Sequence, residues 1–286
     1  CALPILAAWM RENYGSTMIQ ALRTVLPIQE KIKAKEKKYI CLDISEEAGA
    51  QLLKELEQTR FKARTRLLRE LLEKKRLDYT HAAKELGTTS AVVKKFQEQG
   101  IIRIEYDEIM RTSLNTGDIS GERRMPLTDE QEAAVKQIQR EWKKPSPKPV
   151  LIEGVTGSGK TQVYIKLIEQ TLSQGKEAIV LIPEIALTYQ TVRRFYARFG
   201  DKVSVINSRQ SQGERYDQFK RAKKGEVQVM IGPRSALFTP FASLGLIIID
   251  EEHESSYKSE STPRYHARET AIRRAVLEHA NVVMGS

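Results

Sequence analysis

The sequence has 286 residues, which is enough for two or three domains of ordinary size. Hydrophobic residues make up 40% and charged residues 29%, so a disordered chain is excluded and a soluble globular protein with a core is expected. The 47 Lys and Arg exceed the 37 Asp and Glu by a net charge of +10, which favours a polyanionic partner such as nucleic acid. A merely soluble basic surface would have the same composition.

The two cysteines, Cys1 and Cys41, have neither CxxC nor zinc-ligand spacing. A disulfide framework is not expected, and a reducing cytoplasm fits this cysteine usage. No run approaches the ~18 apolar residues that span a bilayer, and the apolar start lacks the basic segment of a signal peptide. We therefore expect a cytoplasmic protein with no membrane partner. Because no Met begins the chain and Ser286 ends it on a strand, we expect a fragment.

Residues 1–43 predict two helices and a basic segment. A Gly15–Ser16 break separates the helices, and the second ends near Pro27. The following KIKAKEKKYICL partly alternates Lys with apolar residues, which predicts an edge strand. This stretch is too short to fold alone.

Residues 44–114 predict a small winged-helix domain. Ser45 can cap a first helix, and a basic helix follows from about Arg60 to Lys75. DYTHAAKELG and SAVVKKFQEQG then form a helix-turn-helix pattern, and IIRIEYDEIMRTS is expected to form a hairpin with Asp107 and Glu108 at its tip. Such a domain can contact DNA, or it can serve as a spacer or protein-docking module, and the sequence favours neither.

Residues 115–126 are polar, contain Gly and end in Pro, which predicts a linker. Residues 127–286 instead predict an α/β domain with a parallel sheet, because near-continuous apolar strands alternate with helices. The expected strands are PVLIEG, EAIVLIP, KVSVIN, VQVMIG, LGLIIID and ANVVMG. The expected helices lie near 129–141, 161–173, 185–199, 213–223 and 266–279.

A phosphate-binding loop follows the first of these strands. It comprises Gly154, Val155, Thr156, Gly157, Ser158, Gly159, Lys160 and Thr161, which is G-x-x-x-x-G-K-[ST] between a strand and a helix. Its backbone N–H groups can wrap phosphates at the helix N-terminus. Lys160 is expected to reach the β- and γ-phosphates of ATP, and the Thr161 hydroxyl is expected to bind Mg²⁺.

A pair of carboxylates follows the strand LGLIIID. Asp250 is placed to hold Mg²⁺, and Glu251 is placed to orient and deprotonate the attacking water. With Lys160 they form the candidate catalytic set. Upstream, Gln131 lies early in a helix that Thr128 or Asp129 caps, where its amide could read adenine or serve as an ordinary helix residue.

These motifs together resemble superfamily 2 helicases, through GVTGSGKT, LIPEIALT, IGPRSALFTPFASLGLIIIDEEHESSYK and their order. Within them, GVTGSGKTQVY, PEIALT and RYHARETA resemble the PriA family of replication-restart helicases. The resemblance covers nearly all of residues 127–286 and implies a RecA-like motor lobe. Residues 1–43 resemble the remnant of the family's N-terminal DNA-binding domain, and the winged helix precedes the motor as it does in the family.

The resemblance implies a 3′-to-5′ DNA helicase driven by ATP and Mg²⁺ that acts at stalled forks in primosome assembly. Its partners would be forked, single-stranded and duplex DNA, other primosome proteins and the single-stranded-DNA-binding protein. The residues expected to contact DNA are Pro183, Glu184, Arg234, Ser235, Tyr257, Arg264, Tyr265, His266 and Arg268. The first four follow strand ends, where parallel sheets bind ligands, and the loop aromatics could stack on bases or only support the loop.

The sequence departs from the family at Asn207, where His is usual, and at Arg209, where Gly is usual. It also lacks the second motor lobe with its arginine finger and its zinc-binding cysteines, so zinc is expected only in a missing C-terminal part. The fragment is expected to be inactive alone. The rival hypotheses are another superfamily 2 DNA translocase, such as a restriction-enzyme motor, and an ATP-switched DNA-binding adaptor. Glu251 argues against the adaptor, because a switch needs no water-activating carboxylate.

Overall fold

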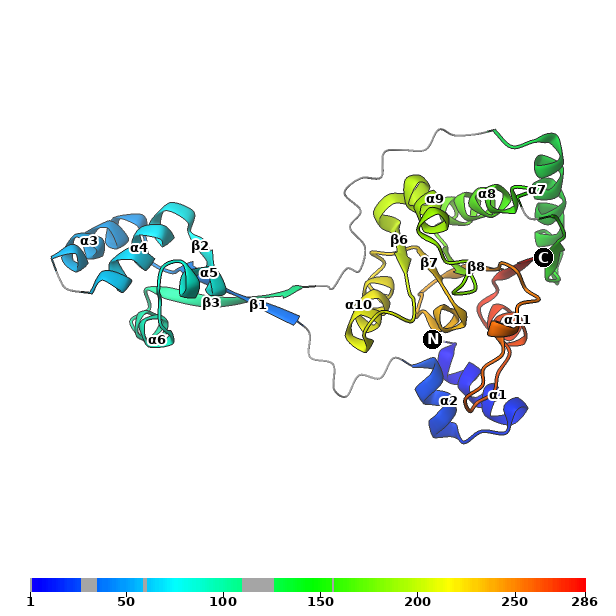
Figure 1. The fold of residues 1–286 in the computed structure, drawn as a ribbon, viewed down its shortest axis with the longest axis horizontal. Helices are drawn as coiled ribbons and strands as arrows, with labels where there is room; N and C mark the ends of the chain where they lie inside the picture. The colour runs from blue at the N-terminus through cyan, green and yellow to red at the C-terminus, as the bar shows by residue number, and fades with distance from the viewer. Residues whose placement is uncertain (1, 27–34, 59–60, 110–125, 156) are drawn as a thin grey trace. The chain divides into compact units, whose positions relative to one another are not determined.

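The computed structural model describes residues 2–26, 35–58, 61–109, 126–155 and 157–286 (Figure 1). These residues divide into two compact units. The large unit contains residues 2–26 and 126–286, and the small unit contains residues 35–109. Among the described residues, no helix combines the length and the apolar character that a membrane crossing requires.

A six-stranded sheet organises the large unit, and all of its neighbouring strands are parallel, in the order β4-β9-β8-β5-β7-β6. The strands are β4 (Val150–Ile152), β5 (Glu177–Leu181), β6 (Val203–Val205), β7 (Val229–Gly232), β8 (Leu244–Ile249) and β9 (Asn281–Gly285). Every apolar segment predicted to be a strand is one. The α/β fold class with a parallel sheet is therefore confirmed, as the expected RecA-like lobe requires.

Helices cover both faces of this sheet (Figure 1). One face packs against α7 (Asp129–Trp142), α8 (Lys160–Ser173) and α9 (Tyr189–Phe199), and the other against α10 (Gln212–Lys223) and α11 (Ala267–Glu278). Three 3-10 turns connect elements of this unit: η1 (Gly200–Lys202), η2 (Arg234–Phe238) and η3 (Ser255–Tyr257). Along β5, Ala178 and Val180 face the first core, whereas Ile179 and Leu181 face the second. This alternation explains why β5 is apolar at every position after its first residue, Glu177.

The first two helices pack on the large unit. They are α1 (Leu3–Tyr14) and α2 (Met18–Val25), and Gly15 ends α1 in the left-handed conformation. Their apolar side chains share a core with Phe238 and Tyr265, and the Tyr14 hydroxyl donates a hydrogen bond to Glu269 Oε2 at 2.6 Å. The helices thus gain from the large unit the core that they are too short to build alone.

The small unit combines a three-stranded antiparallel sheet, in the order β2-β1-β3, with four helices. The strands are β1 (Lys35–Leu42), β2 (Arg76–Asp78) and β3 (Ile102–Ile109), and the helices are α3 (Glu46–Glu57), α4 (Lys62–Lys74), α5 (Tyr79–Lys84) and α6 (Ser90–Glu98). Ile40, Leu68, Leu71 and Phe96 lie in its buried core.

Two predictions in this region are wrong. The Lys-rich segment forms the central strand β1, not an edge strand, and Asp107 and Glu108 lie inside β3 instead of at a hairpin tip. The reason is non-local, because β1 pairs with β3 along its whole length and leaves no need for a turn. Strand β1 therefore joins the small unit, so the described part of this unit begins at Lys35, whereas the predicted domain begins at residue 44. Of the expected linker, residues 115–125 lie outside the described residues.

We predict that Leu68→Ala will lower the free energy of unfolding of the small unit by about 2–5 kcal/mol, because Leu68 is fully buried in its core. Ile248→Ala, in the core of the large unit, is the matched variant. Hydrogen exchange read separately for each unit checks this. If Leu68→Ala accelerated exchange equally in both units, the two cores would not be separate.

Candidate functional site

The candidate site lies where strands of the large unit end at the carboxyl edge of the sheet, the usual ligand-binding edge of a parallel sheet. Strand β4 leads into the phosphate-binding loop and α8, and β8 leads into Asp250 and Glu251. Strand β9 lies between β4 and β8 in the sheet. Lys160 Nζ lies 3.9 Å from Glu251 Oε1, so the two motifs that are far apart in sequence face each other here.

The phosphate-binding loop enters α8 through a left-handed glycine. Gly159 is the N-cap of α8 with φ of +85°, a conformation that residues with a Cβ rarely adopt. Gln131 lies against it, because the Gln131 Nε2 donates to the Ser158 carbonyl at 3.2 Å while its Oε1 accepts from the Thr128 N–H. Thus Gln131 both caps α7 and braces the loop, and its expected contact with adenine stays a prediction. Thr156 lies outside the described residues.

Lys160 is the first residue of α8 and its side chain is only 10% exposed. Its ammonium donates to the Gly154 carbonyl at 2.6 Å and to the Ser286 carbonyl at 3.0 Å. Thr161 follows it in the first turn of the helix, where free N–H groups and the helix dipole favour an anion. These two side chains lie at the position that the sequence motif predicts.

Asp250 continues from β8, and its N–H donates to the Leu181 carbonyl at 2.9 Å. Burial is the main cause that raises the pKa of its carboxyl above the ordinary value. The hydroxyl of Tyr164 opposes this effect by donating to Asp250 Oδ1 at 2.9 Å, and the neighbouring Glu251 charge adds to the rise. The nearby Lys160 charge also lowers this pKa, but burial outweighs it, so the desolvated carboxylate suits a further cation.

Glu251 has a left-handed backbone with φ of +48°, which is uncommon for a residue with a Cβ. Its carboxylate lies between the Lys160 ammonium and His253 Nε2, which is 3.7 Å from Oε2. His253 Nδ1 in turn lies 3.1 Å from the Ser286 hydroxyl. Backbone strain of this kind persists where the surrounding structure holds it and is concentrated at functional sites.

Tyr164 is a site residue that the sequence analysis missed. It lies one turn after Lys160 on α8, is almost fully buried, and reaches Asp250 with its hydroxyl. A Cβ at Gly285 of β9 would overlap that hydroxyl, so the glycine makes room for it. The signal in the sequence was a Tyr on the buried side of the helix, because a buried phenol needs a hydrogen-bond partner.

Pro183 and Glu184 follow β5, and Arg234 and Ser235 follow β7, so all four lie at the carboxyl edge as expected. Pro183 is buried and Glu184 is exposed. The Arg234 guanidinium donates to the Ser256 and Lys258 carbonyls at 2.7 and 2.8 Å. In this structure it therefore holds the loop after Glu251, and a contact with phosphate would have to replace these bonds.

The expectation that Tyr257 and Tyr265 stack on bases is wrong for this structure, because their exposed fractions are 1% and 4%. The Tyr257 hydroxyl donates to the Asp250 carbonyl at 2.6 Å and to the Leu181 carbonyl at 3.0 Å. Tyr265 packs edge-on against Phe238, with 5.4 Å between ring centroids. Both rings support the loop from beneath, which was the alternative left open by the sequence.

Of the other residues of this loop that were predicted to contact DNA, two make contacts within the protein and one is exposed. His266 caps α11 by accepting from the Arg268 N–H at 3.2 Å, and the Arg268 guanidinium pairs with Glu252 at 2.8 Å. Arg264 is exposed, and no ion pair of it with another described residue is found. It is the loop cation that remains best placed for a phosphate.

Comparisons with known proteins agree with these motifs. The family described as "Type III restriction enzyme, res subunit" matches residues 124–284. Replication restart protein PriA of Bacillus subtilis is 48% identical over 203 residues, covering 71% of this chain and 25% of that protein. The protein of the same name in Haemophilus influenzae is 35% identical over 289 residues, covering 98% of this chain and 38% of that protein. The chain therefore spans 25% to 38% of the length of these relatives.

Among solved structures, that of RecG bound to a three-way DNA junction is similar, with 24% identity and a TM-score of 0.42. The similarity covers 57% of this chain and 21% of that one.

We predict that Asp250→Asn will raise the melting temperature near neutral pH, because a neutral amide at this buried position avoids the cost of desolvating a charged carboxylate. The pKa of the Asp250 carboxyl is above 3.8 in the native state, so the native protein holds the carboxyl proton more tightly than the unfolded chain does. The free energy of unfolding therefore falls as the pH rises from 3.8 through the native pKa. The rise in melting temperature caused by Asp250→Asn should be complete above the native pKa and absent below pH 3.8. Thermal unfolding at about pH 7 and about pH 3.5 measures it.

Tyr164→Phe is the matched variant, since it keeps the carboxylate and removes its hydrogen-bond donor. It should lower the melting temperature at neutral pH. If Asp250→Asn lowered the melting temperature equally at both pH values, burial of the charged carboxylate would not be costing stability.

Proposed function

The chain belongs to the family described as "Type III restriction enzyme, res subunit" and is PriA-like in sequence, and from this premise we propose that it contains the first motor lobe of an ATP-dependent DNA helicase. We propose further that the helicase moves 3′ to 5′ and acts at stalled forks in replication restart. Primosome proteins and the single-stranded-DNA-binding protein are its proposed partners.

The observation that carries this proposal is the meeting of two motifs at one edge of the sheet. The N-terminus of α8 presents Lys160 and Thr161, and Glu251 lies 3.9 Å from the Lys160 ammonium. An ATPase needs a phosphate-binding helix end, a metal-binding carboxylate and a water-activating carboxylate at one place. Four side chains provide these groups here: Lys160, Thr161, Asp250 and Glu251.

The residues also fit the magnesium ion that such an ATPase uses. Mg²⁺ prefers oxygen ligands, and the Thr161 hydroxyl and the Asp250 carboxylate are of that kind. Burial raises the pKa of Asp250 even with Lys160 nearby, and a cation beside the carboxylate would supply further positive charge. When bound, the ion would neutralise charge on the transferred phosphate.

The chain's own groups have distinct tasks in the proposed reaction. Lys160 now donates to the Gly154 and Ser286 carbonyls, and it would exchange these acceptors for phosphate oxygens. Glu251 would orient a water molecule and take its proton as the water attacks. Tyr164 would hold the Asp250 carboxylate in place, since its hydroxyl bonds one of the carboxylate oxygens.

The small unit would supply a further contact. Helices α5 and α6, with the turn between them, match the helix-turn-helix predicted from sequence. We propose that this unit is a winged helix that binds DNA, with protein docking as the alternative.

Lys160→Ala should weaken ATP binding by on the order of 10- to 100-fold, because a largely buried ammonium that faces the phosphates is lost. Lys166→Ala is the control, since Lys166 lies on the same helix but pairs with Glu169. Titration with a fluorescent ATP analogue and Mg²⁺ compares the two. Equal affinity of parent and Lys160→Ala would exclude this site.

Glu251→Gln should keep ATP binding and slow turnover by roughly 10²- to 10⁴-fold in the full-length protein, since an amide cannot accept the proton from water. Glu254→Gln, three residues along the same loop, is the charge-matched control. Single-turnover hydrolysis in the presence of DNA measures the effect. Unchanged turnover in Glu251→Gln would remove this residue from the role of general base.

A further inference from the structure

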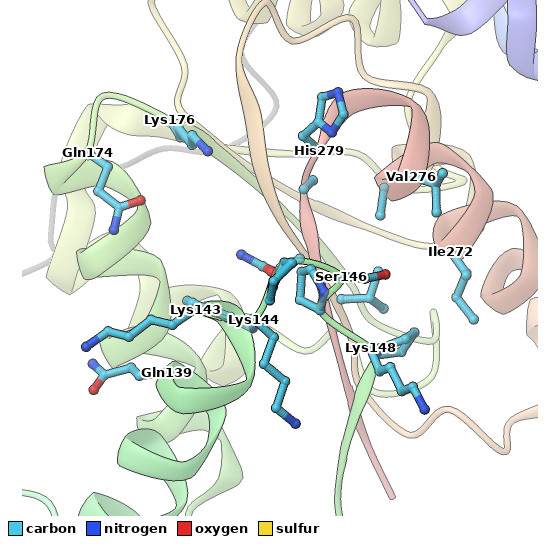
Figure 2. Close-up of a pocket in the computed structure, with 18 of the residues that line it drawn as sticks. Gln139, Lys143, Lys144, Ser146, Lys148, Gln174, Lys176, Ile272, Val276 and His279 are labelled. Atoms are coloured by element: carbon cyan, nitrogen blue, oxygen red, sulfur yellow. The ribbon is translucent and has the colours of Figure 1, made fainter.

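A broad groove, drawn in Figure 2, lies at the amino edge of the sheet of the large unit. The candidate ATP site lies at the opposite, carboxyl edge. It has a volume of about 830 Å³ and is bounded by residues just before β4, β5 and β9 and by the C-terminal ends of α7, α8 and α11. Its lining includes Lys143, Lys144, Lys148 and Lys176. No acidic side chain is found among the described residues that line it.

The positive charge of this groove exceeds what the surrounding structure needs. Lys144 pairs with Glu141, which lies outside the lining and whose carboxylate also accepts from the Lys148 backbone N–H and is close enough to interact with the Lys148 charge. No ion pair within 4 Å of a described carboxylate is found for Lys143, Lys148 or Lys176. The three helix ends that meet here each carry about −0.5 charge, roughly −1.5 in total. Lysines often complement helix ends in this way, but four of them leave an excess of positive charge that points to a polyanion.

Neutral hydrogen-bonding groups accompany the lysines. Gln139, Gln174 and Ser146 belong to the lining, and Figure 2 shows them around the same opening as the labelled lysines. Amides and hydroxyls beside basic side chains are the usual contacts to phosphate and sugar oxygens in DNA complexes. The indole N–H of Trp142, also in the lining, is buried and has no hydrogen-bond partner among the residues that the structure describes.

The lining favours a duplex over a single strand or an acidic peptide. Sites for single strands stack successive bases on a series of aromatic rings. Among the described lining residues, the only Phe, Tyr or Trp is the half-buried Trp142, and the one other aromatic ring is the His279 imidazole, so such a series is not found here. Peptides bind through anchoring side chains in well-packed pockets. The lining also has smaller apolar residues, three prolines among them. Its largest aliphatic side chains on a helix, Ile272 and Val276, both come from α11, and Val276 is 61% exposed, so these two do not close a pocket. A phosphodiester backbone needs neither feature.

We propose that this groove binds the phosphodiester backbone of duplex DNA. The contact would be separate from the DNA track proposed at the carboxyl edge, because β8 has six residues and, at about 3.3 Å per residue, separates the two edges by roughly 20 Å. The two contacts would then engage different segments of a branched DNA. This use rests on the proposed helicase function, whereas duplex binding by the groove can be tested without it.

The test uses the 286-residue chain with Lys143→Gln, Lys148→Gln and Lys176→Gln combined. A charge-matched control combines Lys202→Gln, Lys223→Gln and Lys224→Gln, which lie near β6 at the far side of the sheet. Binding of a fluorescent blunt duplex is measured by anisotropy at several salt concentrations. The groove variant should reduce the slope of log affinity against log salt by roughly 2 to 3, at about 0.9 per lost phosphate contact. Replacing the same three lysines by Arg should preserve the slope.

Several outcomes would overturn the proposal. One is an unchanged duplex slope in the groove variant, and another is an equal loss in the control variant, which would indicate general surface charge. Loss of poly-glutamate binding with intact duplex binding would assign the groove to an acidic peptide. ATP titration of the same proteins separates the two proposals: the groove variant should bind ATP as the parent does, and absent ATP binding by the parent would refute the proposed function without affecting the duplex result.

Discussion

A strand that is buried on both faces can present polar side chains only where it ends, and this constraint shapes the large unit. Strands β5 and β8 are buried at every position, and the only charged residue in either is Glu177 at the first position of β5. Because their neighbours are all parallel, their carboxyl ends meet at one edge. Lys160, Asp250 and Glu251 meet there as a direct result. The opposite edge collects the helix C-termini and the turns that carry the lysines of the groove.

The residues of the candidate site have unfavourable environments or backbone conformations that the surrounding structure maintains. Burial raises the pKa of Asp250, Glu251 has a left-handed backbone, and the Tyr164 hydroxyl occupies space that a side chain at Gly285 would fill. The first two features cost stability, and the third lets the Tyr164 hydroxyl reach Asp250. Such a trade suits a site whose groups must be arranged before the ligand arrives.

The loop after Glu251 connects three parts of the large unit. Tyr257 bonds the Asp250 carbonyl, Arg234 bonds two carbonyls of the loop, and Tyr265 lies in the core formed by α1 and α2. A displacement of this loop by a ligand would therefore act on the backbone of Asp250 and on the N-terminal helices together. The buried tyrosines serve this connection instead of stacking on bases.

The sequence by itself determined the six strands of the large unit, its helices and the position of the phosphate-binding loop and the carboxylate pair. These depend on local patterns, since apolar runs, caps and glycine-rich turns act within a few residues. Only the tertiary structure decided that β1 pairs with β3, that Tyr257 and Tyr265 turn inward, and that Tyr164 reaches Asp250. Each of these depends on a partner distant in the chain, and neither a basic strand nor an aromatic loop encodes locally what will cover it.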